Sequence, residues 1–141
     1  MKNIRFLTHQ EIFDRVVAHL TEQRGAALLP RGGGAYRGAC GGCPIGHFIR
    51  PTDYSTAMEG VPVRYLIGTT LSHPSYMDAG IAALRKALLK AKINVYEERT
   101  VALLSCLQNV HDAFGVWEWQ ERLLSIAREF GLVADRLKAA A

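Results

Sequence analysis

The sequence lacks any apolar run near the roughly 20 residues that a membrane-spanning helix needs, so no membrane partner is expected. It also lacks the motifs GxxxxGK[ST], GxGxxG, GxSxG and HExxH of common nucleotide-binding proteins and hydrolases. Its first residues show no apolar stretch followed by small residues. No secretory signal is therefore expected, and a cytoplasmic protein is predicted.

Cysteine is scarce and charge of one sign is not concentrated anywhere. Three cysteines, an odd number, in a chain of 141 residues favour reduced thiols or metal ligands over a disulfide framework. The length predicts one domain, residues 1–141, with a core of its own.

The net charge of +4 is spread along the chain, which supports nucleic-acid binding only weakly. The cluster Arg85-Lys86 with Lys90 and Lys92 is interpreted as the solvated side of a helix.

Apolar periodicity predicts a mainly α fold, with an α+β fold left open. A capping box, Thr8-His9-Gln10-Glu11, indicates where the first helix begins. Between Gly25 and about Gly60, glycine and proline interrupt every period, so a Gly/Cys-rich loop is expected, with short strands or short helices at Phe48-Ile49 and Val61–Ile67. Helices are expected over Thr8–Arg24, 78–93, 96–114 and 117–130, the last ended by Gly131.

The loop contains the pattern C-x2-C-x3-H, formed by Cys40, Cys43 and His47. Cysteine and histidine at this spacing can bind one zinc ion, and the two glycines between the cysteines allow the tight turn that such a site needs. A structural site requires four ligands, and His111 is the candidate from the second half of the chain. Helical spacing puts His111 on the inward side of its helix, where a hydrogen-bonded core histidine is the alternative interpretation. Cys106 is interpreted as a small buried hydrophobe.

The same residues allow a second chemistry. Cys43 precedes Pro44, which favours the first position of a helix, and a thiol at a helix N-terminus is readily deprotonated. His111 is then the candidate base and Asp112 the candidate orienting carboxylate. On an ideal helix, however, Asp112 points about 100 degrees away from His111, which argues against this triad.

Two further loop residues, Tyr36 and Arg37, are candidate binding residues, because an arginine there could present its guanidinium to an anion. Solvation of that arginine is the simpler alternative.

Several motifs resemble those of a group of small uncharacterised proteins from bacteria and their phages, over most of the chain. They are Ala35-Tyr36-Arg37-Gly38, Cys43-x3-His47, Met58-Glu59-Gly60 and Leu107-Gln108-x2-His111-Asp112, where the group has C-A-Y-R-G, C-x3-C, M-E-G and L-Q-x2-H-D. Gly34 replaces a cysteine of that pattern, and His47 replaces the second cysteine of C-x3-C. Since cysteine and histidine exchange as zinc ligands, this departure favours the metal interpretation, with Cys40 as the substitute for the missing cysteine. The resemblance also implies an accessory protein of a phage or mobile element.

The sequence alone therefore favours a non-enzymatic, mainly α module that binds a protein partner. Its loop would be held by zinc through Cys40, Cys43, His47 and His111. The alternative is a hydrolase or transferase with Cys43 as nucleophile, His111 as base and Asp112 beside it. A weaker alternative is a nucleic-acid-binding accessory protein that uses its arginines.

Overall fold

The computed structural model describes residues 5–23, 44–67, 75–135 and 137, and its architecture over these ranges is mainly α. The described elements include four α-helices, which are α1 (His9–Gln23), α2 (Asp78–Lys90), α3 (Glu98–Ala113) and α4 (Trp119–Phe130). None of the described helices has the length and apolar character needed to cross a bilayer. The expectation of a mainly α fold is confirmed.

The capping box at the start of α1 forms as the sequence predicts. The Thr8 amide donates to Oε1 of Glu11 at 3.0 Å, and the Glu11 amide donates to Oγ1 of Thr8 at 3.1 Å. The Arg5 guanidinium also donates two hydrogen bonds to the Glu11 carboxylate, both 3.0 Å long. Together these donors lower the pKa of Glu11, the Thr8 amide being the largest cause. Two backbone amides that a helix start leaves unpaired are satisfied in this way.

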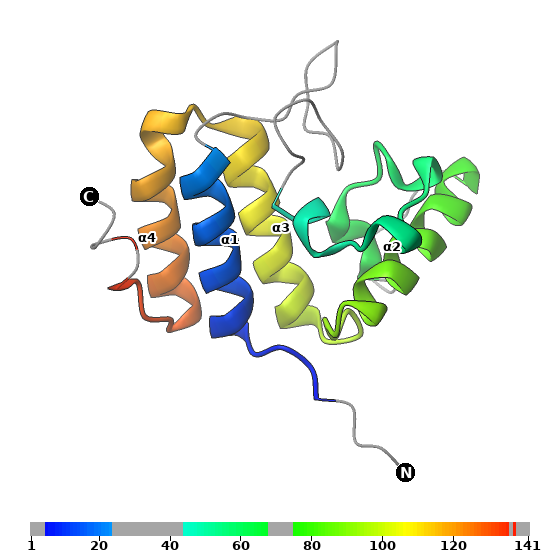
Figure 1. The fold of residues 1–141 in the computed structure, drawn as a ribbon, viewed down its shortest axis with the longest axis horizontal. Coiled ribbons are helices and arrows are strands. Elements are labelled where there is room, and N and C mark those ends of the chain that lie inside the picture. Colours follow the sequence, from blue (N-terminus) through cyan, green and yellow to red (C-terminus); the bar gives the residue numbers. More distant parts are fainter. Residues whose placement is uncertain (1–4, 24–43, 68–74, 136, 138–141) are drawn as a thin grey trace.

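Helix α3 is the central element of the fold (Figure 1). It contacts α1 and α4 on one side, and on the other it contacts η4 (Val63–Leu66), a short 3-10 helix. Its inward side chains, including Leu103, Leu104 and Leu107, are fully buried. Burying one such leucine contributes about 1.5–3 kcal/mol, so α3 carries much of the apolar core.

The stretch from Pro44 to Ile67 forms tight 3-10 turns, and it contains no strand. These turns are η1 (Gly46–Phe48), η2 (Pro51–Asp53), η3 (Thr56–Met58) and η4. The short strands left open for Phe48-Ile49 and Val61–Ile67 are therefore absent from this described part of the chain. Glycines and prolines too closely spaced for a sheet ladder still permit single turns closed by hydrogen bonds from residue i+3 to residue i.

Helix α2 packs with its backbone close to η3. A Cβ placed on Gly80 would lie 2.3 Å from the carbonyl oxygen of Ala57 and 2.7 Å from Cγ2 of Val61. Only a glycine allows the two segments to approach so closely. This contact fixes the position of the chain that follows η3, from Gly60 to Arg64, which lines the site described below.

Candidate functional site

The residues proposed from the sequence fall into two groups. Tyr36, Arg37, Cys40 and Cys43 lie outside the described residues, and so does Gly34. The second group, described in the structure, comprises His47, Cys106, His111 and Asp112.

His111 lies in the last turn of α3, and its side chain has no solvent exposure. Its ring lies beside that of Trp119 at the start of α4, with centroids 5.9 Å apart and planes inclined by 32°. The inward orientation that helical spacing predicts is therefore confirmed.

His111 and Asp112 are hydrogen-bonded to each other, which corrects the expectation that they diverge. The distance from Nδ1 of His111 to Oδ1 of Asp112 is 2.9 Å. The angle between neighbouring Cβ directions on a helix is real, but the side-chain torsions of both residues bring the two polar ends back together. Since an ionised carboxylate only accepts, the pairing with Asp112 has the Nδ1–H of His111 as the donor.

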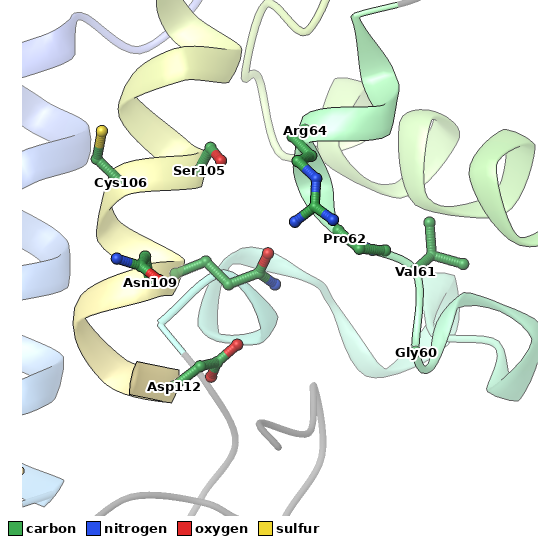
Figure 2. A pocket seen from close by; sticks show the side chains of 9 residues that line it. Gly60, Val61, Pro62, Arg64, Ser105, Cys106, Asn109 and Asp112 are labelled. Atoms are coloured by element: carbon green, nitrogen blue, oxygen red, sulfur yellow. The ribbon is translucent and has the colours of Figure 1, made fainter. Parts of the chain in front are cut away.

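A pocket of about 380 Å³ lies beside Asp112, between α3 and the segment that leads into η4 (Figure 2). Asp112, whose side chain is 31% exposed, lies at one end of the pocket. Across it, Oε1 of Gln108 accepts a hydrogen bond of 3.2 Å from the Val63 amide and joins the two walls. The residues lining the pocket are Gly60, Val61, Pro62, Arg64, Ser105, Cys106, Gln108, Asn109 and Asp112.

Two motifs noted in the sequence meet at this pocket. Gly60, from Met58-Glu59-Gly60, lies on one wall and has a φ of +80°, which glycine adopts without strain. Gln108 and Asp112, from Leu107-Gln108-x2-His111-Asp112, lie on the other wall. Segments nearly fifty residues apart in sequence therefore converge on one hollow.

Sequence reasoning missed the polar lining of the pocket. Ser105, Asn109 and Asp112 follow one another at helical spacing and form a polar stripe on α3, while Arg64 extends from the opposite wall toward it (Figure 2). The guanidinium of Arg64 also lies 5.1 Å from the ring centre of Tyr65. The spacing of these three residues can be seen in the sequence, but on its own it is typical of an ordinary solvated helix face. It indicates a pocket wall only once η4 is known to lie opposite.

Cys106 is half-buried, and its sulfur points away from Arg64 and Asp112, although the residue borders the pocket (Figure 2). Burial, together with the nearby Glu129 carboxylate, raises the pKa of its thiol. A thiol held in its protonated form is a poor nucleophile and a poor metal ligand. The interpretation of Cys106 as a small apolar side chain fits this environment.

His47 is exposed on η1 and stacks on His19 of α1, a residue that the sequence analysis did not single out. The ring centroids are 4.7 Å apart, with an angle of 29° between the planes. Across the described ranges, no three side chains of the types that bind metals are grouped together. Zinc binding by Cys40, Cys43, His47 and His111 stays a prediction, because both cysteines lie outside those ranges.

Comparisons with protein-family models, curated proteins and solved structures give no match. The functional proposal therefore rests on the residues of the site.

Proposed function

We propose that the protein is a thiol-dependent hydrolase or transferase with Cys43 as nucleophile and His111 as general base. Asp112 is the positioning residue. The observation that carries this proposal is the 2.9 Å hydrogen bond between Nδ1 of His111 and Asp112. An imidazole oriented by a carboxylate through one nitrogen, with its other nitrogen basic, is the general-base unit of enzymes with serine and cysteine nucleophiles.

The course of the chain supports Cys43 as the nucleophile. The segment that begins at Pro44 starts beside the C-terminal half of α3, in the overall view and in the close view of the pocket (Figures 1 and 2). Pro44 and Ile45 are buried there. Cys43 is bonded to Pro44 and itself lies outside the described residues.

The residues then account for acyl transfer as follows. His111 Nε2 takes the proton of the Cys43 thiol, and the sulfur attacks the carbonyl carbon of an ester, thioester or amide. The bond from that carbon to the leaving group breaks, and the leaving group receives the proton from Nε2. Water or another acceptor releases the acyl group in a second step. The hydroxyl of Ser105 and the amide of Asn109 supply neutral hydrogen-bonding groups in the adjoining pocket.

The test is the alkylation rate of each cysteine by iodoacetamide, followed by mass spectrometry between about pH 5 and pH 10. In the wild type, we expect Cys43 to react with an apparent pKa well below the ordinary thiol value of about 8.5. In Asp112→Asn, the wrong tautomer of His111 is favoured, so the rate of Cys43 near neutral pH falls at least about tenfold. Cys106→Ser is the control and leaves the rate of Cys43 unchanged.

The zinc interpretation makes the opposite prediction in the same experiment. A carboxylate on one histidine nitrogen is also the usual support of a metal-bound histidine. If the purified protein holds about one zinc per chain, and its thiols react only after a chelator is added, the metal interpretation replaces the enzyme. A metal-free protein in which Cys43 reacts no faster than an unfolded peptide contradicts both.

A further inference from the structure

The outer face of α2 carries a basic groove of about 570 Å³, at the opposite edge of the molecule from α4 (Figure 1). Its apolar lining residues include Ala82 and Leu89. Its cations belong to the cluster that was interpreted from the sequence as the solvated side of a helix. In the structure, these side chains line one hollow. The residues lining this α2 groove are Ala82, Arg85, Lys86, Leu89, Lys90, Lys92 and Tyr96.

Most of the positive charge in the α2 groove is uncompensated. Lys90 lies with its Nζ 3.4 Å from Oδ1 of Asp53, so its charge is partly balanced. Within the described part of the chain, Arg85, Lys86 and Lys92 form no ion pair. No carboxylate among the described residues lines this groove. Three cations gathered in one groove with apolar lining residues attract a polyanion much more strongly than the same charges scattered over the surface.

The backbone at Lys92 brings an aromatic ring to the α2 groove. Lys92 has a φ of +68°, which is uncommon for a residue other than glycine, and it reverses the chain after α2. Its carbonyl accepts a hydrogen bond of 2.7 Å from the Leu7 amide, which holds this reversal against the start of α1. As a result, Tyr96 returns to the edge of the groove with 73% of its surface exposed.

A second hollow of about 280 Å³ continues the α2 groove. It shares Arg85 and Tyr96 with the groove, and Leu66, Ile67 and Val95 contribute an apolar wall. Of the carboxylates in the described residues, Glu98 alone lines this second hollow. The two hollows together form a track with a guanidinium and an exposed aromatic ring at its centre.

We propose that this track binds single-stranded nucleic acid without sequence preference. Phosphates would pair with Arg85, Lys86 and Lys92, and a base would stack on Tyr96. A cationic groove with an exposed aromatic ring is the arrangement with which proteins bind single strands, because every base offers a π face. An acidic protein segment would use the cations but would gain little from a largely exposed ring at the junction of two hollows. The proposal is independent of the thiol chemistry, which uses α3.

The probe is a fluorescein-labelled oligothymidylate of about 16 nucleotides, followed by anisotropy over a range of salt concentrations. The cations are removed with Lys86→Gln and Lys92→Asn, since asparagine tolerates the left-handed backbone at position 92. We expect the double variant to bind at least about tenfold more weakly, and its log–log salt slope to become shallower by about 1.4, or about 0.7 for each lost phosphate contact. We expect Tyr96→Leu to weaken binding about tenfold with the slope unchanged.

The matched control is Arg15→Gln with Arg128→Gln, which removes the same charge from exposed positions on α1 and α4. It should retain wild-type affinity to within about twofold. Equal losses in the two double variants would show that net charge alone drives binding, and would overturn the proposal. Undetectable binding at low salt would also overturn it. So would displacement of the probe by polyglutamate as efficiently as by unlabelled oligothymidylate, because that result indicates a site for acidic proteins.

Discussion

His9 Nε2 lies 2.8 Å from Oε1 of Glu97, although the two residues are 88 positions apart in the sequence. Oγ1 of Thr100 is 2.9 Å from the same histidine nitrogen and donates a hydrogen bond of 2.6 Å to the same carboxylate oxygen. These three side chains join the first turn of α1 to the first turn of α3. The start of α1 is thereby fixed to α3, the helix that carries the candidate site.

The first prediction concerns pH. The Thr100 hydroxyl, and after it His9, lower the pKa of Glu97 below its usual value of 4.5. The stabilisation is therefore complete above about pH 4.5 and is lost as the pH falls through the lower pKa of the folded state. Glu97→Gln should lower the free energy of unfolding in urea near pH 7 by less than about 1 kcal/mol, since the carboxylate is half exposed, and this difference should shrink in acid. Glu98→Gln is the control, with no such pH-dependent loss.

The second prediction concerns the start of α1. Thr8→Ala removes the acceptor for the Glu11 amide and should cost about 1 kcal/mol of folding stability. Thermal and urea unfolding of the two proteins measure this difference. Thr52→Ala, at an exposed position in η2, is the matched control and should change stability by less than about 0.5 kcal/mol. Equal effects of the two substitutions would contradict the role given to the cap.

The third prediction concerns the contact between α2 and η3. Alanine favours a helix over glycine by about 1 kcal/mol, so Gly80→Ala would stabilise an isolated α2. In the folded protein the added Cβ meets the carbonyl oxygen of Ala57 at 2.3 Å, and a backbone atom cannot rotate away. We expect net destabilisation of about 1–3 kcal/mol by urea unfolding. A stabilised Gly80→Ala variant would show that the two segments separate easily.

The fourth prediction concerns the thiol of Cys106. Burial raises its pKa above that of an ordinary thiol, so its alkylation rate should still be rising beyond pH 9. Unfolding the protein in urea should restore ordinary reactivity at the same pH. A plateau in the rate below pH 9 in the native protein would mean that the thiol is solvated.

Sequence periodicity predicts the four α-helices because each carries an apolar stripe that must be buried. Helix ends are also encoded locally: the capping box precedes α1, and Gly131, with a φ of +67°, follows α4. The turns between Pro44 and Ile67 could not be predicted, since 3-10 turns of three or four residues have no usable period.

The candidate site was only partly predictable, for physical reasons that particular residues make clear. The inward placement of His111 follows from helical geometry alone. Its bond to Asp112 depends on side-chain torsions, which the spacing of positions along a helix does not contain. The roles of Arg64 and Asn109 depend on a tertiary contact between η4 and α3, marked by the hydrogen bond from Val63 to Gln108.

The close approach of Gly80 to Ala57 also has a mechanical consequence. Together with the ion pair between Lys90 and Asp53, it clamps α2 and the turns from η2 to η3 into one stiff unit. The chain from Gly60 to Arg64 leaves that unit and forms one wall of the pocket, while α3 forms the other. The pocket thus lies between these two parts, and the hydrogen bond from Val63 to Gln108 joins its two walls. A small rotation of α2 would widen or narrow the pocket without unfolding either part.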